Sequence, residues 1–178
     1  SSIVTILALH GGGIEPATTE LAYTIAHCGD YNYFSFKGMR SKGNNELHVT
    51  STHYDDQIAL DLVRGSQRTV AIHGCEGNES VAYIGGSDDR LIELITESLE
   101  DIGISVREAP HHISGTQENN IVNMTQTQGG VQLELTAQLR KELFKNRKSS
   151  RKNRENKDNW DDLMYDFADA MKKAIERA

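Results

Sequence analysis

The sequence predicts an α/β fold, a layered arrangement in which helices flank a mixed, mostly parallel sheet. Short apolar runs such as residues 3–9 and 68–73 are typical of buried strands, and helical patterns separate them along the chain. Residues 88–102 carry the apolar spacing of an amphipathic helix, which Gly103 ends. A chain of 178 residues suffices for one sizeable core, so we expect a single domain over residues 1–178.

The predicted strands and helices alternate from the start of the chain. Strands are expected at residues 3–9, 31–36, 46–52, 68–73, 80–84, 104–108 and 131–135. Helices are expected at residues 18–27, 57–63, 88–102 and 160–177. A further helix is expected to lead out of the strand at residues 131–135, and residues 110–120 are expected to form a polar loop.

Charge is unevenly distributed along the chain, whose net charge is -7. Nine of its 19 Lys and Arg residues lie between Arg140 and Lys157. We predict a solvated basic helix end and loop at residues 139–158, with attraction of a polyanion as the alternative. The acidic body and the few aromatic residues argue against a nucleic-acid partner, and no apolar run approaches the roughly 20 residues that span a bilayer. We expect a soluble monomer without a membrane partner.

Three consecutive glycines separate His10 from the segment that carries Glu15. Such a run is costly in backbone entropy and marks a sharp turn or the close approach of a ligand. Because Glu15 precedes Pro16 and a predicted helix, the turn can return its carboxylate to the side of His10. His73 ends another strand, and strand ends of an α/β sheet meet at one crevice. Two histidines and one carboxylate form the ligand set of a catalytic zinc site whose fourth position is left for water.

A hydrolytic metal site also needs a base, and the strand at residues 131–135 offers one. Gln132 and Glu134 are two residues apart and therefore share a face of that strand, opposite its apolar side chains. A buried Glu134 beside the metal would accept a proton as water attacks a carbonyl and pass it to the leaving amine.

Several features of the sequence have structural interpretations as well. A histidine at a strand end is more often hydrogen-bonded than metal-bound, and three glycines also form anion-binding nests. The glycines are not followed by the Lys of a nucleotide-binding loop, and the chain has no G-x-S-x-G motif of a serine hydrolase. His48 and His53 are interpreted as structural, His111 and His112 as solvated loop residues, and Cys75 as a small buried thiol.

Ordered motifs extend over nearly the whole chain to about residue 144. They are HGGGIEPATTELA, GNNELHVTSTHYDD, VAIHG, YIGGSDD, NNIVN and GVQLELT. With these motifs the chain resembles the phage-type poly-γ-glutamate hydrolases, whose fold is similar to a compact zinc carboxypeptidase. The resemblance implies one Zn²⁺ per chain held by His10, Glu15 and His73, with Glu134 as the catalytic carboxylate.

The same resemblance implies a substrate and a reaction. The substrate is poly-γ-glutamate, a polyanionic capsule polymer, and the reaction is endo-type hydrolysis of its γ-linked amides to short oligomers. Its α-carboxylates need cationic or amide partners. The candidate substrate-binding residues are Arg40, Lys42, Asn44, Arg90, Asn120 and Asn123.

Two rival functions remain open from the sequence. One is a zinc-dependent deacylase of small N-acyl amino acids, which would need a closed pocket. The other is a metal-bearing module that binds an anionic polymer without cutting it, although such a module has no need of Glu134 as a base. The sequence leaves the cellular location open, and we expect action on extracellular polymer by a protein that is secreted or released on lysis.

Overall fold

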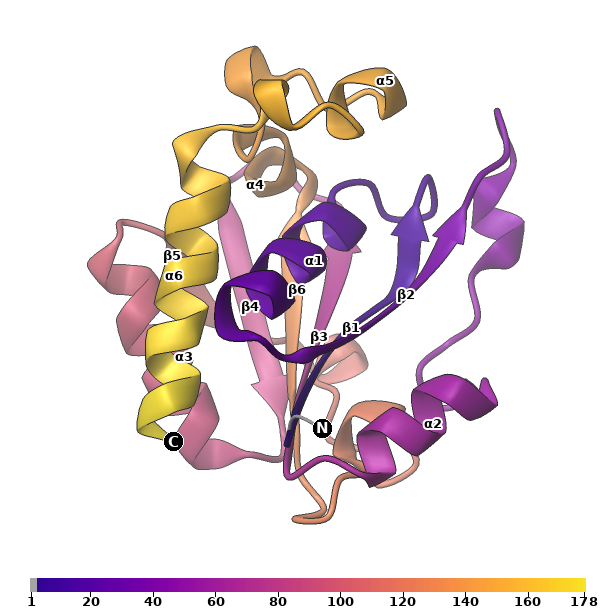
Figure 1. Ribbon diagram of the computed structural model, residues 1–178, viewed down its shortest axis with the longest axis vertical. Helices are drawn as coiled ribbons and strands as arrows, with labels where there is room; N and C mark the ends of the chain where they lie inside the picture. Colours follow the sequence, from indigo (N-terminus) through magenta and orange to yellow (C-terminus); the bar gives the residue numbers. More distant parts are fainter. Residues whose placement is uncertain (1–2) are drawn as a thin grey trace.

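The computed structural model describes residues 3–178, and within them one sheet of six strands forms the centre of the molecule (Figure 1). The strands are β1 (Val4–Gly12), β2 (Asn32–Gly38), β3 (Arg68–Cys75), β4 (Val81–Gly86), β5 (Ser105–Glu108) and β6 (Val131–Thr136). Their order across the sheet is β2-β1-β3-β6-β4-β5. Every neighbouring pair is parallel except β4 and β6, which run antiparallel. The prediction of a mixed, mostly parallel sheet is confirmed.

Helices cover both faces of this sheet. Helices α1 (Thr18–Gly29), α3 (Asp89–Asp101) and α6 (Asp162–Arg177) pack on one face and share a core with the apolar side chains of the strands. Helix α2 (Gln57–Arg64) packs on the other face together with the short 3-10 helix η3 (Ile121–Asn123). The remaining short helices are η1 (Asn44–Leu47), η2 (His111–Ile113), α4 (Ala137–Glu142), η4 (Lys145–Arg147), α5 (Arg151–Arg154) and η5 (Lys157–Asn159).

The apolar run of β1 shows why the sheet lies between two layers. Ile6 and Ala8 face the core beneath α1, α3 and α6, whereas Leu7 and Leu9 face the smaller cluster beneath α2. All four side chains are buried, because a central parallel strand is covered on both faces. Helices α3 and α6 start at acidic caps: Asp88 accepts a hydrogen bond from Leu91 N at 3.1 Å, and Asp161 accepts one from Leu163 N at 3.0 Å.

The predicted strand at residues 46–52 is wrong. These residues form the end of η1 and an irregular segment that turns at Thr50, whose carbonyl accepts a hydrogen bond from His53 N at 2.9 Å. Gly43, with φ of 79°, and Asn44 fold the chain into η1 before a strand can start. The alternating pattern has another origin, since His48 and the carbonyl of Val49 point to the ends of the neighbouring strands.

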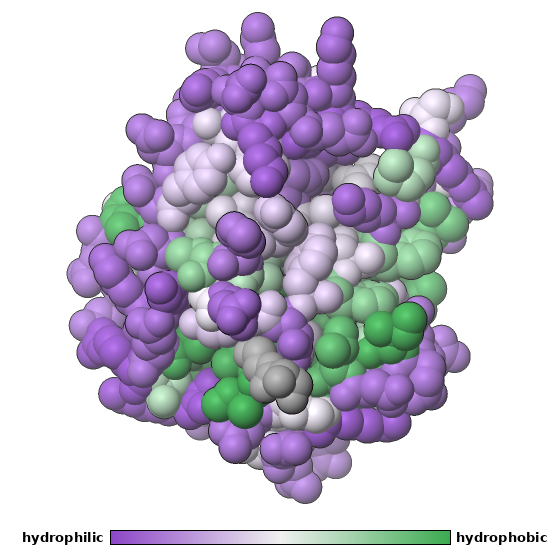
Figure 2. Space-filling model, viewed as in Figure 1, coloured by the Kyte–Doolittle hydropathy of each residue, from purple (hydrophilic) through white to green (hydrophobic). Residues whose placement is uncertain are grey.

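The basic segment forms a hydrophilic cap. Figure 2 shows hydrophilic side chains covering the top of the molecule, over α5 and the segments beside it. Two of its arginines are not simply solvated, because Arg154 is buried and Arg140 is half-buried. Within residues 3–178, no helix is both long and apolar enough to span a bilayer.

Candidate metal centre

A cavity of about 460 Å³ lies at the carboxyl ends of β1, β3 and β6. All four residues that the sequence proposes for chemistry line it: His10, Glu15, His73 and Glu134. His48, which the sequence analysis interprets as structural, lines it too. The parallel arrangement of β1, β3 and β6 brings these residues together, because the ends of parallel strands open at the same edge of a sheet.

The glycine turn after β1 returns Glu15 to His10. Gly12 has φ of 63°, and a Cβ there would lie 2.5 Å from Gly38 O, so a side chain is excluded by both strain and space. The turn closes with Glu15 N donating to His10 O at 2.8 Å. The Glu15 carboxylate then lies beside the imidazole, with Oε1 3.0 Å from His10 Nδ1.

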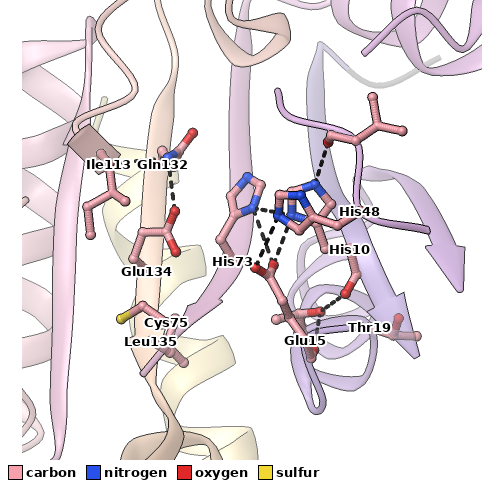
Figure 3. A network of polar contacts seen from close by, with 12 residues as sticks. His10, Glu15, Thr19, His48, His73, Cys75, Ile113, Gln132, Glu134 and Leu135 are labelled. Carbon is pink, nitrogen blue, oxygen red and sulfur yellow. Dashed lines mark hydrogen bonds and ion pairs between the residues drawn. The ribbon is translucent and has the colours of Figure 1, made fainter. Parts of the chain in front are cut away.

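Three ligand-type atoms converge at this point (Figure 3). His10 Nδ1 lies 3.1 Å from His73 Nδ1, and Glu15 Oε1 lies 3.0 Å from His10 Nδ1 and 3.5 Å from His73 Nδ1. Ligands bound to one tetrahedral Zn²⁺ at 2.0–2.1 Å are separated by about 3.4 Å. The spacing of the three atoms therefore fits a zinc ion.

The hydrogen bonds around the three atoms also suit a cation. His10 Nε2 donates to Val49 O at 2.6 Å, which leaves Nδ1 with its lone pair directed at the other two groups. Burial raises the pKa of Glu15, but the interactions with the His10 and His73 side chains outweigh it and hold the pKa well below its usual range. Burial lowers the pKa of His73, whereas the charges of Glu134 and Glu15 raise it, and the net direction is upward. A positive charge is thus favoured among these atoms.

His48 supplies a fourth donor near the same point. Its ring stacks on that of His10 with centroids 3.7 Å apart, and its Nε2 lies 3.8 Å from Glu15 Oε2. One ligand atom from each of His10, Glu15 and His48 lies within 4.8 Å of the others, so this trio is a second possible ligand set. His48 is on an irregular segment with 39% of its side chain exposed, whereas the buried His73 is fixed on a central strand.

Glu134 lies on the other side of His73 from Glu15 (Figure 3). It pairs with His73 in the register of β3 and β6, and its Oε1 accepts a hydrogen bond from Gln132 Nε2 at 3.1 Å. Burial raises the pKa of Glu134 to about 7, although the charge of His73 lowers it. A carboxyl with this pKa exchanges protons readily at neutral pH, as a general base must.

The Glu134 carboxylate is held by a chain of amides. Gln132 Oε1 accepts a hydrogen bond from Asn120 Nδ2 at 3.1 Å while its Nε2 bonds to Glu134. Gln132→Met would leave the Asn120 amide and the Glu134 carboxylate without these partners. We expect it to lower the free energy of unfolding of the zinc-free protein by about 1–3 kcal/mol, measured by urea denaturation.

The control for this variant is Gln138→Met, because within the described residues the Gln138 side chain donates to its helix neighbour Glu142 at 3.3 Å and to no other group, and Gln138 is half-buried. It should change the free energy of unfolding by less than about 0.5 kcal/mol. Equal losses for the two variants would contradict a special role for the amide chain.

The predicted substrate-binding residues lie in different places. Asn120 lines the cavity, and the other five are not among its lining residues within the described chain. Asn44 bonds to both backbone groups of Arg40, and Arg40 pairs with Glu46 at 2.6 Å. Arg90 lies on α3, exposed and 3.5 Å from Glu93.

Asn123 is buried and fastens its own loop, donating to Gly115 O at 2.6 Å and accepting from Gly130 N at 3.0 Å. Lys42 is exposed. The substrate-binding role of each of these residues stays a prediction. The sequence analysis assigns no place at the site to His48 and does not predict the hydrogen bond between Asn120 and Gln132. For His48 the available signal is a histidine, in addition to His10 and His73, that follows the Gly43–Asn44 turn.

Comparison with known proteins agrees with this site. The sequence model of the family described as "Poly-gamma-glutamate hydrolase" matches residues 1–170. The chain belongs to this family. A solved structure described as bacteriophage poly-gamma-glutamate hydrolase superposes on it with a TM-score of 0.93 at 32% identity, covering 98% of this chain and 83% of that one.

Two curated relatives and a further solved structure are similar to the chain over shorter or longer stretches. The SPbeta prophage-derived UPF0714 protein YoqZ of Bacillus subtilis (strain 168) is 39% identical over 79% of this chain and 52% of its own length. UPF0714 protein YmaC of the same strain is 32% identical over 99% of this chain and 73% of its own. A zinc-free structure of YndL superposes with a TM-score of 0.87 at 30% identity, covering 98% of this chain and 85% of that one. The chain thus spans about half the length of the first of these curated relatives.

Proposed function

We propose that the chain is a zinc-dependent hydrolase that cleaves the γ-glutamyl amide bonds of poly-γ-glutamate. The observation that carries the proposal is the convergence of His10 Nδ1, His73 Nδ1 and Glu15 Oε1 within 3.0–3.5 Å of one another. A buried carboxyl with a pKa of about 7, Glu134, lies beside them. Membership of the poly-γ-glutamate hydrolase family and the likeness to the bacteriophage enzyme support this substrate.

His10, Glu15 and His73 would hold one Zn²⁺, which supplies Lewis-acid polarisation of the substrate carbonyl and a lowered pKa for water. Glu134 accepts the proton of the attacking water and delivers it to the nitrogen of the leaving amine. The C–N bond of the γ-amide breaks, and the products are a new γ-carboxylate and a new amine. Gln132 holds Oε1 of Glu134 at 3.1 Å and so directs the carboxylate during both proton transfers.

Cations on the loop that packs against the glycine turn suit the polyanionic substrate. The loop that carries Arg40 and Lys42 packs closely against the glycine turn. A Cβ added to Gly13 would lie only 2.4 Å from Asn44 Nδ2 of that loop. Both cations are exposed and would donate hydrogen bonds to the α-carboxylates of a polymer that runs past the site. This arrangement supports cleavage within the polymer, with Asn120 donating an amide contact inside the cavity.

We further propose that residues 1–178 form one catalytic domain that acts as a monomer, with one zinc per chain, on extracellular capsule polymer. The experiment that tests it follows the size of long-chain poly-γ-glutamate on a gel during incubation with the purified zinc-loaded protein. Internal cleavage shortens the whole population early, whereas release from an end leaves long chains and monomers. Intact polymer together with hydrolysis of N-acyl glutamate would favour the small-molecule deacylase instead.

A further inference from the structure

Arg140 follows the base-bearing strand by one helical turn, on α4. Its side chain is half-buried and turns back toward the ends of β6 and β3. Nε donates to Leu135 O at 3.1 Å, Nη1 to Pro16 O at 3.0 Å and Nη2 to Cys75 O at 3.0 Å. One guanidinium therefore joins three backbone carbonyls from three separate segments of the chain.

Each of those carbonyls belongs to a residue one or two positions after a residue of the candidate site. Pro16 follows Glu15, Leu135 follows Glu134, and Cys75 lies two residues after His73. We propose that Arg140 is a positioning residue that fixes the relative placement of two zinc ligands and the catalytic base. This inference rests on the proposed zinc site. It adds a function for one residue of the basic segment.

The geometry is specific to arginine. A guanidinium presents donors in a rigid plane, whereas an ammonium is a point charge that cannot reach three carbonyls in one fixed arrangement. The end of β3 leaves room for this plane, because a Cβ on Gly74 would lie 2.7 Å from Cζ of Arg140. Gly74 thus leaves the space that the Arg140 guanidinium occupies beside β3.

The contacts of Arg140 differ from those of the other arginines in the basic segment. Within the described residues it makes no ion pair with a carboxylate closer than 4.0 Å, and its donors bond to carbonyls alone. Arg154 is buried as deeply as any arginine in the chain, but it pairs with Glu20 at 3.4 Å and lines a different cavity, beneath α5. That cavity shares no lining residue with the metal-site cavity.

The test measures zinc affinity, which does not depend on the identity of the substrate. In Arg140→Met and Arg140→Lys, the dissociation constant for zinc, obtained by competition with a chelating dye, should rise about tenfold or more, as expected when groups that orient ligands are lost. The visible absorption of the cobalt-substituted protein should change as well. At saturating zinc, kcat on poly-γ-glutamate should fall about tenfold with KM changed less than about twofold.

The matched control is Arg154→Met, which removes a buried arginine of the same segment. It should lower the melting temperature while leaving zinc affinity and the cobalt spectrum as in the wild type. Addition of guanidinium at low millimolar concentration to Arg140→Ala should restore part of the zinc affinity, an effect that a purely structural role would not produce.

Wild-type zinc affinity in both Arg140→Met and Arg140→Lys would overturn the inference, as would equal losses of affinity in Arg154→Met. If Arg140→Met does not fold, the zinc affinity of Arg140→Lys alone is compared with that of the wild type. Wild-type protein that binds no zinc would refute the proposed site itself. Wild-type protein that binds zinc but leaves the polymer intact would refute only the substrate, and the comparison of Arg140 variants would stand.

Discussion

Glu134→Gln is expected to lower kcat on poly-γ-glutamate by about 10²–10⁴-fold while the protein keeps its zinc, since general acid–base catalysis contributes factors of this size. The glutamine side chain has the same shape, and its amide can still bond to Gln132, which now lies 3.1 Å from Oε1. An amide has no basic oxygen that could take the proton of the attacking water. Initial rates and bound zinc, measured on the same preparation, check this expectation.

Glu134→Asp provides a comparison that keeps the carboxylate but shortens its reach. It should retain more activity than Glu134→Gln, with the same zinc content. A zinc-loaded Glu134→Gln protein with wild-type kcat would exclude Glu134 as the base, and an equal loss of zinc and activity would assign it to the metal site instead.

His73→Ala is expected to weaken zinc binding by more than about 100-fold, because loss of a group that merely orients a ligand already costs 10–100-fold. His73 Nδ1 lies 3.1 Å from His10 Nδ1 and 3.5 Å from Glu15 Oε1, on a strand that is fixed on both sides. Zinc dissociation constants for this variant and for His48→Ala are the measurement.

The comparison with His48→Ala decides between the two possible ligand sets. His48 stacks on His10 and lies 3.8 Å from Glu15 Oε2, so its loss should weaken zinc binding by less than about tenfold. The reverse order, with the larger loss in His48→Ala, would identify His10, Glu15 and His48 as the ligands and refute the role given to His73.

Local patterns in the sequence are enough to predict the strands that carry the candidate ligands. The runs that end at His10 and His73 are buried on both faces, so their apolar residues identify them as central strands, and parallel strands place both histidines at one edge. The glycines before Glu15 likewise predict a turn from composition alone. These conclusions depend only on short-range chemistry and on a general rule for α/β sheets.

The same patterns misinterpret the segment around His48. Its alternation is typical of a strand, yet His48 packs on His10 and the Val49 carbonyl accepts a hydrogen bond from that imidazole. Both contacts span about 40 positions of the chain, and only tertiary structure reveals them. Arg140 is a similar case, since a count of charges treats it like any lysine of the basic segment although its donors bond to three backbone carbonyls beside the site.

We propose that zinc at this site is required for cleavage of poly-γ-glutamate. The decisive experiment is to strip the protein with a chelator, remove the chelator, and titrate zinc back while polymer size is followed on a gel. We expect no cleavage without metal and a rise in rate that levels off at one zinc per chain. Full cleavage by the metal-free protein, or intact polymer after one zinc per chain has bound, would contradict it.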